Sequence, residues 1–349
     1  MKMTRVVKIG NLSIGGKHPV RIKGMIKSPF SNRDAVLAEA RQLEKEGAEA
    51  IRLAIKEEKD AALARILKKH INVPLVADIH FQYRFALAAI ENGFDAIRLN
   101  PLNIEKESEV KEVAREAKKA NIAIRIGINS GGFKKDFASS QALAKQMVKV
   151  VANYIRILER ERFFDIMVSL KGSDPLSTIM ANELFAKDFD YPLHLGVTAT
   201  GSFLSGVVKS SIGLGQLLSQ GIGSVIRVSL TAPSFTEIQV AKYILQALNL
   251  RAFGPQIISC PTCSRCEVNL IQMVEKLQEK LDKVSDAKPI RVALMGCVVN
   301  GPGEARQADI GAAFGQRKAV IFRKDKIIGR SDEKNILNDL CKEARKLWI

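Results

Sequence analysis

Residues 48–100 read AEAIRLAIKEEKDAALARILKKHINVPLVADIHFQYRFALAAIENGFDAIRLN, and this stretch decides the fold. Three short apolar segments alternate in it with two amphipathic segments of helical length: 48–55, 61–70, 74–80, 83–92 and 96–101. Strands that alternate with helices form a parallel sheet with both faces covered, which explains why the strand segments are rich in Val, Ile and Leu. The stretch therefore predicts successive strand-helix units.

The same alternation continues on both sides of this stretch. Further strands are predicted at 19–25, 123–129, 165–171, 192–198 and 224–230, each followed by a helical segment such as 33–46. Eight such units in about 250 residues match a closed α/β barrel of the triosephosphate isomerase type. An open doubly wound sheet is the alternative, but no glycine-rich dinucleotide fingerprint follows the first strand. Ahead of the barrel, residues 4–17 predict a hairpin with Gly15 and Gly16 in its turn.

The alternation stops near residues 251–255, where Pro255 marks a boundary. We therefore predict a substrate-binding barrel over residues 1–250 and a small α+β domain over 251–349. Its expected elements are a helix at 268–283, strands at 290–295 and 310–314, a hairpin through 320–328 and a closing helix at 333–348.

Composition excludes several classes of protein. No apolar run reaches the 18 residues of a membrane span, and the first ten residues are polar and basic. The five cysteines are clustered rather than dispersed, which argues against a secreted disulfide scaffold. We expect a soluble cytoplasmic protein without a membrane partner.

A net charge of +17, from 54 Lys and Arg against 37 Asp and Glu, requires an anionic partner or another explanation. The lysines are spread over helical segments such as 111–119, which is typical of solvated helix faces rather than of a nucleic-acid site. We therefore expect no nucleic-acid partner, and a zinc-stabilised nucleic-acid binder remains the rival from another class.

Arginines are placed differently, because four strands share an apolar-Arg-apolar pattern at 51–53, 97–99, 124–126 and 226–228. A mid-strand arginine must face the barrel interior or the helix layer, and neither place tolerates an unpaired guanidinium. Asp78 is a candidate structural partner, but the arginines together with Lys171 exceed the carboxylates on these strands. The surplus predicts a phosphate or diphosphate site at the C-terminal mouth of the barrel.

Other polar residues stand at predicted strand ends, where the sites of such barrels lie: Asp78, His80, Asn100, Asn129, His194 and Ser229. A lone histidine is more often a core residue than a ligand, so only the ring of polar groups makes His194 a candidate. The segment 202–221 contains several glycines, which serve either an anion-binding loop ahead of a helix or close helix packing.

Four of the five cysteines fall in two segments near the C-terminal end. Cys260, Cys263 and Cys266 are each separated by two residues, and Cys297 lies in a second, glycine-rich loop. Three clustered cysteines and a remote one favour a 4Fe-4S cluster, although the spacing leaves zinc open. Glu304 is close enough in sequence to supply an oxygen ligand that is easily displaced, or else it is a surface carboxylate that caps the next segment.

The chain resembles the bacterial 4-hydroxy-3-methylbut-2-enyl diphosphate synthases over nearly its whole length. The matching motifs are CPTC (260–263), MGCVVNGPGEA (295–305), VPLVADIHF (73–81), IRIGIN (124–129), PLHLGVT (192–198), VVKSSIGLG (207–215) and IRVSL (226–230). The resemblance implies an eight-stranded barrel followed by a small domain that binds a 4Fe-4S cluster. It also implies a head-to-tail homodimer in which the cluster domain of one subunit closes over the barrel of the other.

The resemblance implies reductive ring opening of 2-C-methyl-D-erythritol 2,4-cyclodiphosphate, with a hydroxyl lost as water and two electrons from reduced flavodoxin or ferredoxin. The implied cluster ligands are Cys260, Cys263, Cys297 and Glu304, which leaves Cys266 as an extra cysteine beside the site. The iron beside Glu304 would bind the substrate oxygen, which gives Glu304 a catalytic role. The implied substrate-binding residues are Arg52, Arg98, Asn100, Arg125, Asn129, Lys171, His194, Arg227 and Ser229.

Two departures from the family pattern stand out. The family usually reads Thr-Glu-Ala-Gly where this chain has Thr198-Ala199-Thr200-Gly201, so a carboxylate near the reaction centre is absent. It usually reads Gln-Ser-Met-Thr where this chain has residues 23–26, Lys-Gly-Met-Ile. These changes leave the proton donor for hydroxyl loss unassigned. Two alternatives to a typical member therefore stay open: a slow or altered member of the family, and a relative that acts on another phosphorylated substrate.

Overall fold

The structure is a computed structural model that describes residues 3–282, 289–298, 305–315, 318–324 and 326–348. The chain divides into two compact units, Met1–Arg251 and Ala252–Ile349. Within the described ranges, no helix combines the length and the apolar character that crossing a membrane requires.

Eight parallel strands form the barrel of the first unit, in the order β8-β7-β6-β5-β4-β3-β10-β9. They are β3 (Arg21–Met25), β4 (Ala50–Ile55), β5 (Leu75–Ile79), β6 (Ala96–Leu99), β7 (Ala123–Asn129), β8 (Ile166–Lys171), β9 (His194–Leu195) and β10 (Val225–Ile226). A parallel bridge between Val168 and Leu193 joins the two ends of this order and closes the ring. The predicted eight-stranded barrel is confirmed, and the closing bridge excludes the open sheet.

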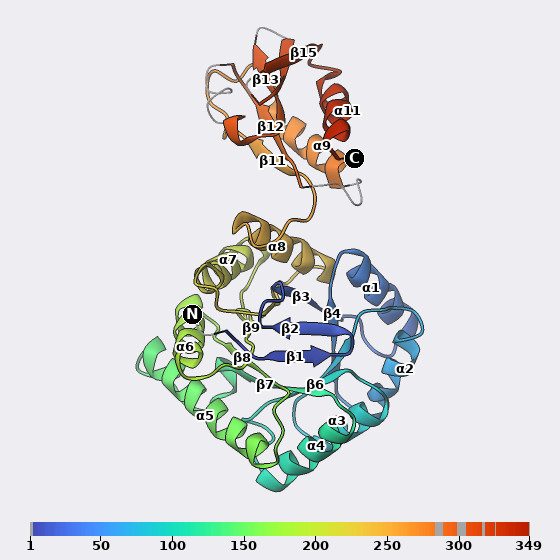
Figure 1. Ribbon diagram of the computed structural model, residues 1–349, viewed down its shortest axis with the longest axis vertical. Helices are drawn as coiled ribbons and strands as arrows, with labels where there is room; N and C mark the ends of the chain where they lie inside the picture. The colour runs from blue at the N-terminus through green and yellow to red at the C-terminus, as the bar shows by residue number, and fades with distance from the viewer. Residues whose placement is uncertain (1–2, 283–288, 299–304, 316–317, 325, 349) are drawn as a thin grey trace. The chain divides into compact units, whose positions relative to one another are not determined.

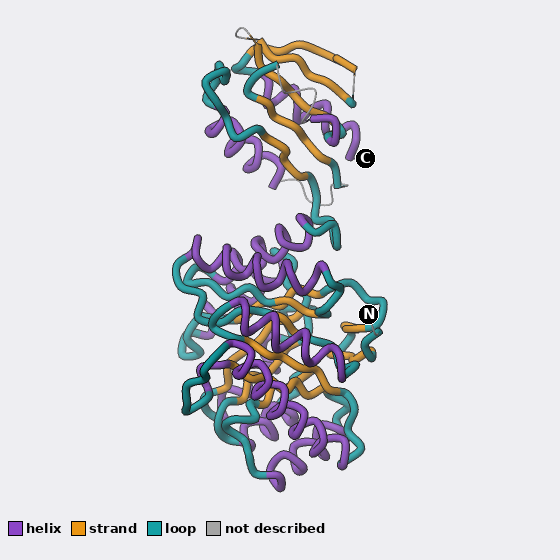
Figure 2. The backbone as a smooth tube through the Cα atoms, turned by 90° about the vertical axis from the view of Figure 1, so that its left-hand side faces the viewer, coloured by secondary structure: helices purple, strands orange, loops and turns teal. Residues whose placement is uncertain are grey.

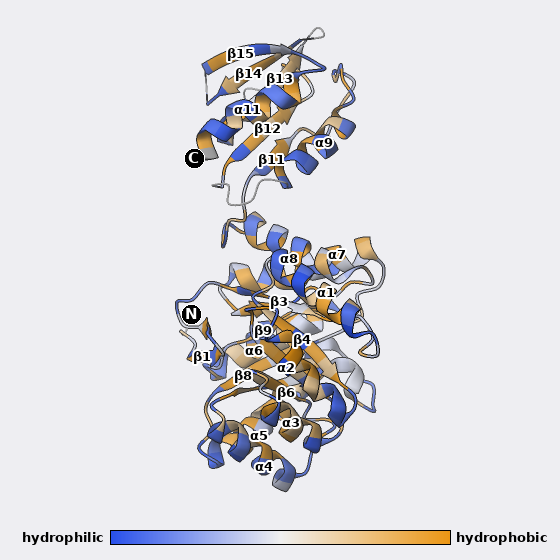
Figure 3. Ribbon diagram, turned by 90° about the vertical axis from the view of Figure 1, so that its right-hand side faces the viewer, coloured by the Kyte–Doolittle hydropathy of each residue, from blue (hydrophilic) through white to orange (hydrophobic). Residues whose placement is uncertain are grey.

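Helices surround the strands, as Figure 1 shows. They are α1 (Arg33–Lys45), η1 (Glu58–Ala62), α2 (Leu63–Leu67), α3 (Tyr83–Glu91), α4 (Glu107–Lys119), η2 (Ser130–Gly132), α5 (Ser140–Arg160), α6 (Pro175–Asp188), α7 (Phe203–Ser219) and α8 (Ser234–Ala247). Most of the long helices bury one stripe against the strands and leave a polar face outward, so hydropathy alternates around the unit (Figure 3), whereas α7 also exposes apolar side chains. The side chains of Asn32, Ser139 and Asp174 cap α1, α5 and α6 by accepting a backbone N–H bond from the first turn.

The N-terminal hairpin, β1 (Val6–Ile9) and β2 (Leu12–Gly15), has its turn at Gly10 and Asn11. The predicted turn at Gly15 and Gly16 was wrong by five residues. A two-residue turn of this kind needs a positive φ, which Gly10 supplies at 56°. Gly15 and Gly16 also have positive φ, but they lie where the chain leaves the hairpin.

The inside of the barrel has an apolar floor and a charged layer above it. The hairpin residues Val7, Ile9 and Ile14 pack against the first inward residues of five strands, which are Val76, Ala96, Ala123, Met167 and Val225. Because side chains alternate along a strand, inward positions two or four residues further along lie closer to the C-terminal mouth. Polar side chains occupy such positions on all five strands, and with one polar side chain each from β3, β4 and β9 they form what we name the charged layer: Lys23, Arg52, Asp78, Arg98, Arg125, Lys171, His194 and Arg227.

The second unit is a five-stranded sheet in the order β11-β12-β13-β14-β15. Its elements are β11 (Gln256–Ser259), α9 (Leu270–Asp282), β12 (Arg291–Met295), η3 (Ala305–Gln307), β13 (Ile310–Gly315), β14 (Lys318–Arg323), β15 (Lys326–Asp332) and α11 (Ile336–Trp348). Leu277 of α9 and Leu340 of α11 share a core with Phe314, so both helices cover the same face of the sheet (Figure 2). The strands β11, β12 and β13 are parallel to one another. Strand β14 pairs antiparallel with β13, and β15 pairs antiparallel with β14.

Candidate active site

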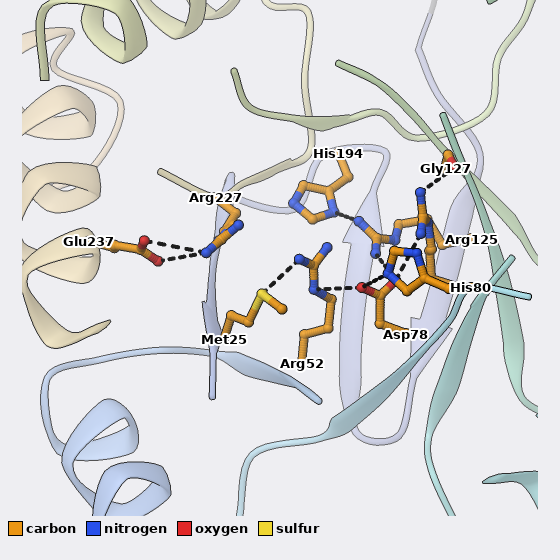
Figure 4. Close-up of polar contacts among 10 residues, drawn as sticks. Met25, Arg52, Asp78, His80, Arg125, Gly127, His194, Arg227 and Glu237 are labelled. Atoms are coloured by element: carbon orange, nitrogen blue, oxygen red, sulfur yellow. Dashed lines mark hydrogen bonds and ion pairs between the residues drawn. The ribbon is translucent and has the colours of Figure 1, made fainter. Parts of the chain in front are cut away.

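Asp78 is the centre of the charged layer. Three guanidiniums from three neighbouring strands surround its carboxylate: Arg98 at 3.2 Å, Arg52 at 3.6 Å and Arg125 at 4.0 Å. His80 also contacts the carboxylate, with 3.2 Å between Nε2 and Oδ2 (Figure 4). Burial alone raises the pKa of Asp78, but the three arginines and the bond from His80 outweigh it and hold the pKa well below its usual range. Asp78 is therefore ionised and partly neutralises three cations.

Arg227 obtains its countercharge from outside the barrel. Its Nη2 lies 3.1 Å from Oε2 of Glu237, a buried residue on α8. The same carboxylate accepts the backbone N–H of Leu230 and pairs with Lys27 at 2.9 Å. Glu237 therefore ties the loops that follow β3 and β10 together and orients Arg227.

Arg125 fixes the protonation of His194. The Arg125 Nη1 lies 2.6 Å from Nδ1 of the fully buried imidazole. A guanidinium only donates hydrogen bonds, so Nδ1 accepts and the ring proton lies on Nε2. Burial, followed by the charges of Lys171 and Arg125, lowers the pKa of His194 well below its usual value, so the ring is neutral. Nε2 is buried without a partner among the described residues, which makes it a donor available to a ligand.

Two lysines of the charged layer have no countercharge. Lys23 and Lys171 are both buried, and no described residue forms a hydrogen bond or an ion pair with either side chain. Lys171 lies against the backbone of Gly196, where a Cβ would come within 2.6 Å of its Nζ. Burial, then the neighbouring arginines, lowers the pKa of both lysines well below the usual value. Across the described part of the layer, six cations therefore face only Asp78 and Glu237.

A cavity of about 1070 Å³ gives access to this layer from the C-terminal ends of the strands. Arg52, Asp78, Arg98 and Arg227 line it, and the loops after β3 and β4 contribute much of its rim. A cavity of this size accommodates a small ligand. Because the Nε atoms of Arg52, Arg125 and Arg227 are also buried without hydrogen-bond partners among the described residues, the arrangement suits a compact polyanion.

The remaining predicted substrate residues lie at or after the ends of three strands. Asn129 ends β7 and lines the cavity. Asn100 is buried just after β6, where its Oδ1 accepts the backbone N–H of Leu102. Ser229 follows β10, and its carbonyl accepts the hydroxyl of Thr200. The sequence predicted that the arginines meet at the C-terminal mouth of the barrel. In the structure they lie in the charged layer inside the barrel, and Arg52, Arg98 and Arg227 line the cavity above it.

Two glycines of segment 202–221, Gly206 and Gly213, serve helix packing, whereas a Cβ on Gly215 would meet open space. Nearly all of the segment is α7, and a Cβ on Gly206 would come within 2.5 Å of Leu230, as one on Gly213 would come within 2.8 Å of Val197. Of the two interpretations of this segment, the structure supports close packing of the helix on the barrel.

Two functional contributions were missed from the sequence. Glu237 lies in a helix, and its pairing with a strand arginine leaves no local pattern. Gly127 accepts the Nη2 of Arg98 at 2.6 Å, and a Cβ there would lie 2.6 Å from the Arg98 Nε. The signal for Gly127 was the IRIGIN motif itself, in which a glycine interrupts a strand two residues after Arg125.

The second unit brings the two cysteine segments to one edge of its sheet. The parallel strands β11 and β12 pair Ser259 with Leu294, so Cys260 and Cys297 follow adjacent strand ends. The backbone N–H of Gly296 donates to Sγ of Cys260 at 3.4 Å. A Cβ on Gly296 would come within 2.4 Å of Sγ of Cys266, which shows why this position needs glycine.

The donor chemistry of the two cysteine segments fits an iron-sulfur group. The cysteine segments supply thiols from two adjacent loops, and a backbone N–H already donates to one sulfur, which is a bond that stabilises a ligating thiolate. Cys266 differs, because its thiol donates to the carbonyl of Val268 at 3.3 Å. Glu304 lies outside the described residues. Among the residues that are described, no three His, Cys, Asp or Glu side chains are grouped closely enough to hold a metal ion.

Comparison with known families gives two matches that together cover most of the chain. Residues 4–242 match the GcpE TIM-barrel domain, and residues 256–346 match the GcpE protein C-terminal domain. A protein of Caldanaerobacter subterraneus subsp. tengcongensis is 44% identical over 348 residues, which cover 99% of this chain and 98% of that protein. A protein of Dehalococcoides mccartyi is 45% identical over 341 residues, which cover 98% and 97%. Both are named 4-hydroxy-3-methylbut-2-en-1-yl diphosphate synthase (flavodoxin).

Two solved structures of other enzymes resemble about 70% of this chain. A dihydropteroate synthase of Burkholderia cenocepacia superposes with a TM-score of 0.53 at 14% identity, over 72% of this chain and all of that one. A type I 3-dehydroquinate dehydratase of Clostridium difficile gives 0.51 at 17% identity, over 70% and 98%. At these identities the likeness shows the fold.

Proposed function

The chain belongs to the GcpE family, and from this membership we propose that it forms 4-hydroxy-3-methylbut-2-en-1-yl diphosphate from the 2,4-cyclodiphosphate of 2-C-methyl-D-erythritol. The protein is an enzyme of the isoprenoid pathway, an oxidoreductase whose relatives are named for this product. The observation that supports the substrate most strongly is the charged layer, where six basic side chains face two carboxylates; four of the six are buried, and Arg52 and Arg227 are partly buried. A cyclic diphosphate is small, rigid and doubly anionic, so it would supply the negative charge that balances the surplus basic side chains of this layer.

The residues of the barrel bind and orient the substrate in this proposal. Arg52, Arg98, Arg125 and Arg227 are held by Asp78 and Glu237 in fixed directions, so little side-chain entropy is lost when they bind phosphate oxygens. Lys171 adds a charge, and the Nε2 proton of His194 adds a donor. The proposed polar contacts at strand ends are Asn100, Asn129 and Ser229.

The second unit holds the redox group in this proposal. Cys260, Cys263, Cys297 and Glu304 would ligate a 4Fe-4S cluster, and the bond between Gly296 and Cys260 supports that assignment. When bound, the cluster supplies the two electrons of the reduction, one at a time, and an iron whose oxygen ligand, Glu304, is displaceable. Residues 1–250 are accordingly the substrate domain and 251–349 the cluster domain.

Flavodoxin is the proposed electron donor, because the curated relatives carry it in their names. Ferredoxin, which the sequence left equally open, has no such support. Neither a nucleic acid nor a membrane takes part in the proposed activity. The rival functions, a zinc-stabilised nucleic-acid binder and a reductase for another phosphorylated substrate, are not favoured by relatives about 45% identical over the whole chain.

Anaerobic purification followed by metal analysis and a product assay tests this function. We expect about four iron and four sulfide per chain, little zinc, and formation of the linear diphosphate when the cyclodiphosphate and reduced flavodoxin are supplied. A colourless zinc protein that binds nucleic acid with a steep salt dependence would support the rival instead. An iron protein that binds the cyclodiphosphate without turning it over would point to another substrate.

We also propose a homodimer, supported by an apolar stripe on α7. Leu204, Val208 and Ile212 follow one another at helical spacing and are 72%, 49% and 52% exposed. Such a stripe is typical of an interface between subunits. Light scattering of the purified protein should give twice the mass of the chain, and Leu204→Glu with Val208→Glu should give the mass of one chain. A monomeric wild-type protein contradicts the proposal.

Ala199 offers a test of the missing proton donor. It lies in the loop after β9, exposed, with a left-handed φ of 52°. A longer side chain at this position has open space and meets no more backbone strain than Ala already does. We expect Ala199→Glu to raise kcat about tenfold or more, because a positioned general acid contributes roughly 10²–10⁴-fold. Ala199→Gln matches it in size without a transferable proton, so equal rates in the two variants would remove the carboxylate from the mechanism.

A further inference from the structure

Lys23 is a buried cation outside the proposed set of substrate-binding residues. It is 2% exposed, and no described residue forms a hydrogen bond or ion pair with its side chain. Each arginine of the charged layer contacts Asp78 or Glu237, so Lys23 and Lys171 are the two cations of the described layer that lack such a partner. An unpaired buried ammonium is costly, which implies a partner that the protein itself does not provide.

The strand geometry directs Lys23 into the barrel. Its neighbour Gly24 faces the helix layer, because a Cβ on Gly24 would lie 3.3 Å from the side chains of Leu43 and Ala48. Side chains alternate along a strand, so Lys23 points the opposite way, into the charged layer. The charged groups that act on its ammonium come from four other strands: Arg52 of β4, Asp78 of β5, Arg125 of β7 and Lys171 of β8. Its own charge is felt in turn by His194 of β9.

Ring opening changes the charge of the bound diphosphate. A cyclic diphosphate diester carries two ionised oxygens. When one carbon-oxygen ester bond breaks, the released phosphate oxygen becomes a third, since the second ionisation of a phosphate monoester has a pKa near 6. The reaction balances as cyclodiphosphate dianion, two electrons and one proton giving linear diphosphate trianion and one water. The site must therefore stabilise one more negative charge at the end of the reaction than at the beginning.

We propose that Lys23 binds the phosphate oxygen that ring opening releases, so that it stabilises the linear diphosphate more than the cyclic one. This inference rests on the proposed function for the identity of the two ligands. The other binding residues match positions that the resemblance assigns to substrate, whereas at this position the family usually has Gln. Compared with the usual family pattern, this chain therefore has one additional basic side chain, in a site whose ligand becomes more negative during the reaction.

The protonation of Lys23 agrees with this role. Burial, followed by the charges of Arg125 and Arg52, lowers the pKa of Lys23 well below its usual value. An anion beside the ammonium favours the protonated form and raises that pKa. At a pH between the two values, binding of the linear diphosphate therefore takes up a proton at Lys23.

Titration calorimetry on the full-length protein tests the proposal with two probes, inorganic pyrophosphate and the cyclodiphosphate. Lys23→Gln should weaken the binding of pyrophosphate about tenfold or more, as expected for a lost hydrogen bond to a charged group, and that of the cyclodiphosphate by less than about threefold. Proton uptake on pyrophosphate binding, measured in buffers of different ionisation enthalpy, should also fall. Lys145→Gln, which removes an exposed charge on α5, should change neither affinity.

Lys23→Met separates binding from folding, because it keeps the length of the side chain and removes its charge. The ligand-free variant should melt at or above the wild-type temperature, since burying an amine without a partner is costly. Pyrophosphate should raise the melting temperature of the variant less than it raises that of the wild type. Equal pyrophosphate affinity in wild type and Lys23→Gln, equal losses for both probes, or no pyrophosphate binding by the wild type would each overturn the proposal. Failure of the proposed function looks different: the wild type would not bind the cyclodiphosphate, while pyrophosphate binding would still report on Lys23.

Discussion

Replacing Asp78 by Asn should destabilise the protein by about 3–5 kcal/mol, because removing one partner of a buried ion pair leaves the other charge uncompensated. The loss is shared by three guanidiniums, since Arg52, Arg98 and Arg125 all face this carboxylate. Asn keeps the size of the side chain, so the effect is electrostatic rather than a cavity. Urea denaturation of the wild type and the variant at neutral pH measures the difference in the free energy of unfolding.

The pH dependence of that difference identifies its cause. The pKa of Asp78 lies well below its usual range in the folded protein, so the stabilisation is complete above the unfolded pKa, near pH 4, and is lost as the pH falls through the lowered pKa. The stability gap between wild type and Asp78→Asn should therefore be constant above about pH 5 and close at lower pH.

Asp190→Asn is the matched control for Asp78. Asp190 pairs with Arg5 at 2.8 Å, but both side chains are partly exposed to solvent. Exposed pairs contribute about 0–1 kcal/mol, so this variant should lose little. An Asp78→Asn protein as stable as Asp190→Asn would show that the three arginines do not depend on the carboxylate.

Replacing Cys297 by Ser should abolish turnover and visible iron absorption together. The residue follows β12 beside the end of β11, where the bond from Gly296 to Cys260 joins the two loops. Because the proposed function makes Cys297 a cluster ligand, its loss should remove the group that supplies the electrons. Activity should then fall at least about a hundredfold, more than the loss typical of a residue that only supports a ligand. Absorbance, iron content and product formation are measured on the same anaerobic preparation.

Two other cysteines provide controls. Cys266→Ser changes a thiol in the loop of Cys260, where it donates a hydrogen bond to the carbonyl of Val268, and we expect the variant to keep iron and activity. Cys341→Ala changes a cysteine buried in α11 and should keep both as well. Iron loss in Cys266→Ser but not in Cys297→Ser would reassign the ligand set.

The barrel could be predicted from the sequence because its signal is local and repeated. Each strand and each helix shows its own periodic pattern of apolar residues. Eight successive strand-helix units are compatible with few architectures. The hairpin turn was misplaced because two residue pairs in this segment, Gly10-Asn11 and Gly15-Gly16, both suit a tight turn. Only the pairing of β1 with β2 shows that the turn is at the first pair. The strand β11 was missed because QIIS is only four residues long and lies between the boundary at Pro255 and the first cysteine, so it was taken as part of the connecting loop.

The charged layer was predicted in part. An arginine between apolar neighbours indicates an inward side chain, so the surplus of positive charge was visible from the chain alone. Which carboxylate neutralises which arginine was not, because Glu237 reaches Arg227 from a helix and Asp78 serves three strands at once. Such contacts depend on barrel closure, which brings residues together that no sequence period relates.

The electron count of the reaction tests the proposed function most directly. Reduced flavodoxin is mixed anaerobically with the iron-loaded enzyme and a limiting amount of the cyclodiphosphate, and its oxidation is followed by absorbance while the linear diphosphate is quantified. Each product molecule requires two electrons, so we predict that two molecules of one-electron donor are oxidised per molecule of product, and that none are oxidised without substrate. Product formed without oxidation of flavodoxin, or flavodoxin that stays reduced when the cyclodiphosphate is added, would contradict the proposed function.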